Sequence, residues 1–286
     1  MMGSAPFDVP PQDIGQPPRP GRSPPRVGII GIHGPEATAC IQVLLEAGMP
    51  LTAWTRRHDS PWARRLARRG VAVRPLDAAG TPAEPPQGVM RPDWLLSCPG
   101  QRLAVPASDL GGVPEACWPA APDRVLELAP AGMPGPRRHR ERTVIRLPTA
   151  VVLERWFDTP MRRTIRRGLL PIPPRSGSAL RLISAHQIAR VVLALCRDGL
   201  DIETATERLA GEWTPIPAVL AACRSQVERP VRPQRRSITA FGLRMGREWA
   251  LMAPLIAERA HRVCTEGDAN CAMLDPMVDR IRRLSW

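Results

Sequence analysis

Two residue types are missing from this chain of 286 residues: it has no tyrosine and no lysine, so all 40 of its Lys+Arg charges are arginine. A GC-rich genome, which favours the codons of alanine, arginine, glycine and proline, is the simplest origin of this composition. The functional consequence does not depend on that origin. Chemistry that needs a tyrosine acid, a lysine Schiff base or a P-loop lysine is excluded.

Cysteine patterns and long apolar runs are also lacking. The seven cysteines form no CxxC pair, and their odd number argues against a disulfide framework. We interpret them as buried free thiols of a protein in a reducing cytoplasm. No histidine pair has metal-ligand spacing, and there is no GxSxG motif, so neither a metal site nor a hydrolase is predicted. We see no signal peptide and no apolar run of about 18 residues that would span a membrane.

Proline and positive charge are abundant, with 35 prolines and a net charge of +13. Such a charge first suggests nucleic acid, but the arginines are spread along the chain with almost no aromatic residues between them for base stacking. Nucleic-acid binding is therefore not predicted. Residues 1–25 are rich in Pro, Gly and Ser, which indicates a disordered tail.

Beyond this tail, short apolar runs alternate with helical patterns as far as about residue 158. We predict strands over 27–30, 51–55, 71–73, 93–97, 124–128 and 143–147, with helices over 37–48 and 60–69. This alternation predicts an α/β fold with a doubly wound parallel sheet, a Rossmann domain over 26–158. Residues 159–286 predict a smaller, mostly helical lobe that binds substrate or a partner, with a cleft between the two parts. Its predicted helices cover 185–195, 214–227 (with Thr214 as N-cap), 237–264 and 274–284.

The first predicted strand runs into a glycine turn and a helix, the arrangement that binds a pyrophosphate. The turn is Gly31-x-x-Gly34-x-x-Ala37, in which alanine at the third position still permits close helix–strand packing. The second strand ends at Arg56 and Arg57, where an acidic residue would read a ribose hydroxyl. Arginine there favours a 2′-phosphate, and hence NADP over NAD. The alternative is that both arginines belong to a solvated basic run.

Several stretches resemble the NmrA-like, atypical short-chain dehydrogenase/reductase family of NAD(P)-binding proteins. They are VGIIGIHGPEATACIQVLLEAGMPLTAWTRR, RGVAVRPLD, DWLLSCPG, RVLELAPAG, RTVIRLPTAVVLERW, ISAHQIARVV and LAGEWTPIPAVLAACRSQVERPV. The likeness covers roughly residues 26–284. It implies that NADP(H) is held by Gly31, Gly34, Ala37 and Arg56, by Asp77 after the third strand, and by Ser97 beside the nicotinamide.

The chain departs from this family where catalysis is expected. Catalytic members carry a serine after the fifth strand and a tyrosine and a lysine on the next helix. Here the strand runs into Ala129-Pro130, both tyrosine and lysine are missing, and residues 132–142 are too short and too rich in Pro, Gly and Arg for a full helix. Tyrosine-dependent carbonyl reduction is therefore excluded.

Three other side chains are candidates for catalysis. His33 lies in the predicted phosphate loop, His186 opens a later helix near the predicted pocket, and Cys98 follows the fourth strand. The alternatives are a loop histidine that faces solvent or the cofactor, a histidine at a helix end and a buried thiol. His139 lies in RRHRER, which we interpret as a solvated basic loop. The cluster RRTIRR at 162–167 indicates a solvated helix face or a docking site for an acidic partner or carboxylated substrate.

Two hypotheses of function follow. The first is a tailoring oxidoreductase of secondary metabolism that uses NADP(H) and transfers hydride directly to a quinone-like or aromatic small molecule, or that reuses its pocket. The second is a non-catalytic NAD(P) sensor, a regulator that acts through a protein partner.

Overall fold

The computed structural model describes residues 23–76, 92–98, 124–130, 137–139, 142–149, 151–157, 159–172, 179–227 and 230–235. Its largest element is a seven-stranded sheet with the order β3-β2-β1-β4-β5-β7-β6. The order 3-2-1-4-5 of the first strands is that of a Rossmann fold, so the predicted fold class is confirmed. The strands of this sheet are β1 (Val27–Ile30), β2 (Leu51–Thr55), β3 (Ala72–Pro75), β4 (Trp94–Ser97), β5 (Arg124–Pro130), β6 (Arg137–His139) and β7 (Arg142–Thr149).

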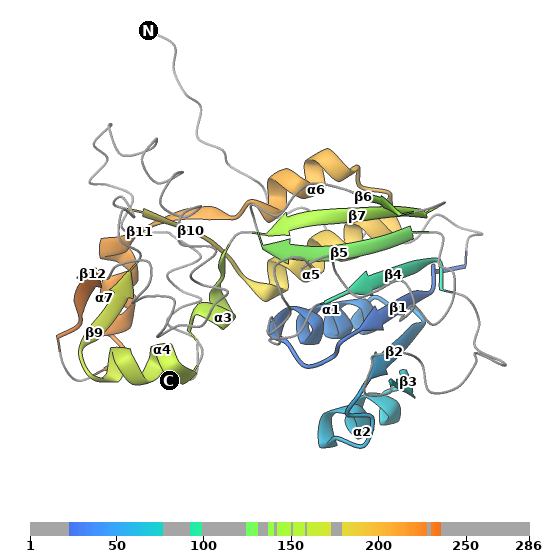
Figure 1. Cartoon of the computed structure of the whole chain (residues 1–286), viewed down its shortest axis with the longest axis horizontal. Coiled ribbons are helices and arrows are strands. Elements are labelled where there is room, and N and C mark those ends of the chain that lie inside the picture. Colours follow the sequence, from blue (N-terminus) through green and yellow to red (C-terminus); the bar gives the residue numbers. More distant parts are fainter. Residues whose placement is uncertain are drawn as a thin grey trace, which may run out of the picture.

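In the spatial order of this sheet, neighbouring strands pair in parallel from β3 at one edge through β2, β1, β4 and β5 to β7. Only β6, at the other edge, runs antiparallel to its neighbour β7. Every residue of β1 and of β4 is buried, which is why both read as continuous apolar runs rather than alternating ones. The arrowheads of β4, β5 and β7 point toward the part of the molecule that holds α3, α4 and β9 (Figure 1). The carboxyl ends of these strands therefore face that part.

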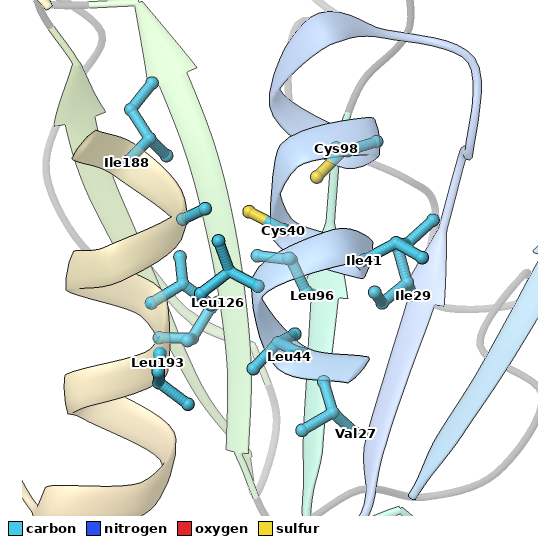
Figure 2. Close-up of a cluster of buried hydrophobic side chains, with 14 of the residues drawn as sticks. Val27, Ile29, Cys40, Ile41, Leu44, Leu96, Cys98, Leu126, Ile188 and Leu193 are labelled. Carbon is cyan, nitrogen blue, oxygen red and sulfur yellow. The ribbon is translucent and has the colours of Figure 1, made fainter. Parts of the chain in front are cut away.

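One face of the sheet is covered by α1 (Pro35–Glu46) and α5 (Ala185–Leu193), which pack side by side. Figure 2 shows the core between them. Cys40, Ile41 and Leu44 of α1 lie over Ile29 and Leu96, and the side chains of α5 lie over β5. A π-helical turn, η3 (Ala194–Asp198), continues α5, and α6 (Ile202–Leu209) follows. Helix α2 (Pro61–Arg68) packs against β3, and its buried Ala63 and Leu66 belong to the same core as α1.

The opposite face of the sheet carries a smaller cluster of buried side chains, Ile30, Trp54, Leu95 and Val125. Gly28 of β1 lies beneath the Trp54 ring, where a Cβ would stand 2.7 Å from a ring carbon and 2.9 Å from Leu95 Cδ1. The absence of a side chain at this position lets the indole pack closely against the strand.

A second core lies outside the large sheet and combines helices with short strands. It contains a three-stranded sheet with the order β11-β10-β8 and a strand pair β12-β9, with Leu153, Phe157, Met161 and Ile165 among its buried side chains. Its elements are β8 (Val151–Val152), α3 (Leu153–Trp156), α4 (Thr159–Arg166), β9 (Leu169–Ile172), β10 (Ala179–Ile183), β11 (Glu212–Pro215), α7 (Ile216–Arg224) and β12 (Arg232–Arg235).

The predicted boundary between the two domains lies at residue 158. Helices α5 and α6 follow that position, yet their buried residues belong to the core of the large sheet. The division into domains at 158 stays a prediction. The predicted helices 237–264 and 274–284 and the predicted tail 1–25, except residues 23–25, lie outside the described residues.

Two local predictions were wrong. Thr214 is not a helix N-cap: it lies in β11 opposite Leu180, and α7 begins after Pro215. His139 does not lie in a loop, because residues 137–139 form strand β6. The basic cluster at 162–167 forms the end of α4, and its Arg163, Arg166 and Arg167 are exposed, as a solvated helix face requires.

No helix among the described ranges is both long enough and apolar enough to cross a membrane.

Candidate functional site

The predicted glycine turn follows β1 directly and is held by its neighbours. Gly31 has a φ of +81°, and its N–H donates to the Trp54 carbonyl at 3.1 Å. The Cys98 N–H donates to the Ile30 carbonyl at 3.1 Å, and a Cβ on Gly31 would lie only 2.6 Å from the Cys98 carbonyl oxygen. Both the backbone angle and the lack of space therefore require glycine at position 31.

Helix α1 begins immediately after this turn with an uncapped N-terminus. Gly34 is its N-cap and has no side chain to accept from the first turn, while Pro35 has no N–H. Ala37, in the first turn, is fully packed against the core. Helices α2, α5 and α6 are capped by Ser60, Ser184 and Asp201. The N-cap residue thus makes no side-chain cap to the N–H groups at the start of α1, as a phosphate site needs, while the buried carboxyl group of Glu36 shares this first turn.

The end of β2 adds positive charge beside this turn. Arg56 and Arg57 are exposed in the turn after the strand, and the Arg57 N–H donates to the buried Thr55 Oγ1 at 3.1 Å. His33 is exposed on the neighbouring turn. Partial burial and the nearby charge of Arg57 lower the pKa of His33, which shows that the two side chains are electrostatic neighbours. The structure thus brings together the candidates at 31, 33, 34 and 57.

A tryptophan that was not among the predicted site residues joins these two loops. Trp62, near the start of α2, donates from its ring Nε1 to the carbonyl of Ile32 at 3.0 Å. Its ring is half-buried and packs against the main core. The only signal in the sequence is an aromatic residue directly after the Ser60-Pro61 helix start.

Two buried polar side chains lie on the face of the sheet opposite α1, one at the carboxyl end of β4 and one in the middle of β5. Ser97 ends β4 with a relative exposure of 2%, and within the part of the chain that the structure describes its Oγ has no hydrogen-bond partner. Glu127 lies beside it in register on β5 and is also buried. Ser97 was predicted as a site residue and Glu127 was not, although a charged residue within an apolar strand is itself a signal.

Cys98 points to the other face, into the core beneath α1. Its sulfur lies near that of Cys40 in Figure 2, and a hydrogen bond between the thiols, together with burial, holds the pKa of Cys40 well above its usual value. Both side chains are buried and free. This environment favours the interpretation of Cys98 as a packed thiol over that of a nucleophile, which needs accessible thiolate.

His186 lies on the exposed side of α5, where its Nε2 accepts from Arg190 Nε at 3.1 Å. The N-terminus of this helix is occupied by a capping box, in which Ser184 accepts from the Gln187 N–H at 3.1 Å and Gln187 Oε1 accepts from the Ser184 N–H at 2.9 Å. Glu154 Oε2 accepts from the Ala185 N–H at 2.8 Å. The start of α5 is thus satisfied internally, unlike that of α1. Asp77 lies outside the described residues.

The chain between β5 and β7 does not return through a helix in the described residues. Strand β6 pairs antiparallel with β7, with Arg137 opposite Val144 and His139 opposite Arg142. A hairpin therefore occupies part of the connection in which the tyrosine and lysine of catalytic short-chain dehydrogenases would lie.

No protein-family model and no curated protein sequence matches the chain. Solved structures do match it. The Citrobacter sp. triphenylmethane reductase complexed with NADP(H) has a TM-score of 0.58 at 14% identity, over 90% of this chain and 99% of the other. The chain has a Rossmann-like fold. The NADPH-dependent quinone oxidoreductase of Escherichia coli, complexed with NADPH, has a TM-score of 0.59 at 16% identity, over 82% and 89% of the two chains.

A third match is a nucleoside-diphosphate-sugar epimerase of Staphylococcus aureus, with a TM-score of 0.57 at 12% identity over 90% of this chain and 95% of the other. The fold-level resemblance to atypical short-chain dehydrogenase-like proteins is therefore confirmed. At these identities the likeness shows the fold alone, and function has to be argued from the site.

Proposed function

We propose that this chain binds NADP(H) at the β1–α1 turn and acts as an oxidoreductase on a small, electron-poor molecule. The observation that carries the proposal is the uncapped N-terminus of α1 behind Gly31, with Arg57 and His33 beside it. A phosphate-rich ligand meets there the N–H groups of a helix start and two basic side chains. The two matched structures that contain NADP(H) or NADPH support this choice of cofactor.

The residues present fit the dinucleotide. Gly31 gives the turn its left-handed backbone angle, and Gly34 places no side chain at the start of α1, so the two would leave backbone N–H groups for a pyrophosphate. The guanidinium groups of Arg56 and Arg57 suit a 2′-phosphate, because a planar fork of donors can bind two of its oxygens at once. Ser97 offers a buried hydroxyl at the carboxyl end of β4, where the nicotinamide half would lie. Asp77 completes the proposed set.

NADPH, when bound, supplies a hydride. The chain has neither the tyrosine acid nor the lysine that would protonate a simple carbonyl substrate. A quinone-like or similarly electron-poor aromatic acceptor does not need them, because it can take its proton from water or from a histidine once the reactants are held together. The work left to the protein is to bind the two reactants and to orient them. The matched E. coli enzyme is named as a quinone oxidoreductase, which supports this substrate class.

One observation favours a second candidate, a non-catalytic dinucleotide sensor. Strand β6 pairs with β7 where a catalytic helix is expected, so this connection contributes to the sheet rather than to an active site. In that case bound dinucleotide would shift the contact with a protein partner, and the exposed arginines of α4 are candidates for that surface.

Titration of the purified chain with NADPH, NADP⁺ and NADH, followed by tryptophan fluorescence, tests cofactor binding. A quinone panel is then added and the absorbance of the reduced nicotinamide is followed. Turnover supports the oxidoreductase, whereas binding without turnover supports the sensor. Arg57→Ala should weaken NADPH binding, and Arg65→Ala, which removes an exposed charge from α2, is its matched control. If the unaltered chain binds no dinucleotide, both candidates are overturned.

A further inference from the structure

Trp62 links two loops of the proposed cofactor site, the glycine turn after β1 and the turn after β2. Its indole Nε1 donates to the carbonyl of Ile32 at 3.0 Å, and Ile32 lies between Gly31 and His33 in the glycine turn. The Ile32 side chain is fully buried, so the turn is anchored on one side by the core and on the other by the indole.

The segment from Arg57 to Trp62 is internally braced. The Arg57 N–H donates to Thr55 Oγ1 at 3.1 Å, and the Arg57 carbonyl accepts from the Ser60 N–H at 3.1 Å. Ser60 Oγ then accepts from the Ala63 N–H at 3.1 Å and caps α2. Because these bonds fix the course of the chain from β2 into α2, the position of Trp62 also sets the position of the Arg57 backbone.

We propose that Trp62 is a positioning residue that determines the preference for NADP(H) over NAD(H). Its hydrogen bond holds the glycine turn, which meets the pyrophosphate, in a fixed relation to the turn with Arg56 and Arg57, which meets the 2′-phosphate. This inference rests on the proposed binding of NADP(H) and adds to it a residue that need not touch the phosphates.

The expected effect is selective because the two cofactors use the loops differently. NADPH bridges both loops, so its affinity depends on their relative placement, whereas NADH lacks the 2′-phosphate and uses mainly the glycine turn. Loss of one net hydrogen bond corresponds to about a fivefold change in an equilibrium constant. For Trp62→Phe we therefore expect about a fivefold loss of NADPH affinity and at most about a twofold loss for NADH.

Trp62→Phe retains an aromatic ring for packing but lacks the N–H donor. Trp54→Phe is the matched control, since it makes the same exchange in the small cluster on the other face of the sheet. The dissociation constants of NADPH and NADH are measured for the unaltered chain and for both variants. We expect the dissociation constant of NADH divided by that of NADPH to fall in Trp62→Phe only. A loss of folded protein would lower both affinities equally and leave their ratio unchanged. Thermal unfolding of each variant measures such a loss directly.

Hydrogen exchange without cofactor gives a second readout. The amides of residues 31–38 and 56–61 should exchange faster in Trp62→Phe than in the unaltered chain, while those of α5 should not. Unchanged exchange in both loops, or an unchanged cofactor ratio in a protein that binds NADPH and NADH, would overturn the role of Trp62 and leave the proposed function intact. Absence of dinucleotide binding in the unaltered chain would instead overturn the proposed function and the specificity role with it.

Discussion

Gly31→Ala tests whether the glycine turn is built as tightly as the structure shows. Gly31 has a φ of +81°, a left-handed conformation that costs an alanine about 1–2 kcal/mol. A methyl group there would also lie 2.6 Å from the Cys98 carbonyl oxygen. The opposing atom belongs to the backbone, so no side chain can swing away, and the ends of β1 and β4 would have to separate. Such overpacking costs about 1–3 kcal/mol more.

Gly48→Ala provides the matched control. Gly48 has a φ of +71°, but no atom lies within 4 Å of the position that its Cβ would take. This variant carries the conformational cost without the contact. For a chain of this size, 1 kcal/mol corresponds to roughly 2–4 °C in Tm. We therefore expect a drop of this order for Gly48→Ala and at least about twice that drop for Gly31→Ala.

Binding separates the two variants further. The displaced turn is the one proposed to hold the pyrophosphate, so Gly31→Ala should lose at least about tenfold in NADPH affinity, or ~1.4 kcal/mol. Gly48→Ala lies at the other end of α1 and should bind normally. Thermal unfolding by calorimetry and fluorescence titration measure the two effects. If Gly31→Ala matches Gly48→Ala in both Tm and affinity, the close approach of the turn to Cys98 is refuted.

Two further predictions concern polar side chains of the site. Ser97→Ala removes a buried hydroxyl that has no hydrogen-bond partner in the described ranges, so stability should stay equal or rise by about 1 kcal/mol while dinucleotide affinity falls. Thr214→Val, which removes a comparable hydroxyl from the second core, should leave affinity unchanged, and equal affinities in both variants would contradict the role of Ser97. The pKa of His33 lies below its usual 6.5 because of burial and Arg57, so His33 is neutral at pH 7. A bound phosphate favours its protonated form and raises this pKa. Affinity for NADH, which lacks the titrating 2′-phosphate, should therefore rise as the pH falls from about 7 to 5 in the unaltered chain, and less so in His33→Asn. If the NADH affinity of the unaltered chain and that of His33→Asn change equally with pH, protonation of His33 is not coupled to binding.

The sequence predicted the central strands β1, β2 and β4 well because they are almost wholly buried on both faces. The run 27–30 has no polar side chain, and 51–55 has only two threonines; both are bounded by glycine, proline or arginine, so their limits coincide with those of β1 and β2. The glycine turn was recognisable for the same local reason, since it stands between a strand and a helix that is opened by Pro35.

The errors arose where contacts distant in sequence decide the local structure. Residues 137–139 are basic and show no alternation, and they form β6 because β7 offers them an unpaired edge. Thr214 has the chemistry of an N-cap, but its backbone pairs with Leu180 instead. Trp62 and Glu127 were overlooked because their partners, the Ile32 carbonyl and the neighbouring strand β4, lie far from them in sequence.

The β6–β7 hairpin limits how this chain could be redesigned as a carbonyl reductase. Introducing a tyrosine and a lysine by substitution would place them on paired strands, where the spacing of side chains differs from the helical one that the dehydrogenase mechanism uses. An engineer would have to insert a complete helix between β5 and β7 and unpair β6 to make room. The nearest accessible activities for directed evolution are therefore those that need only a held dinucleotide and a reshaped pocket, and this scaffold is a natural starting point for testing them.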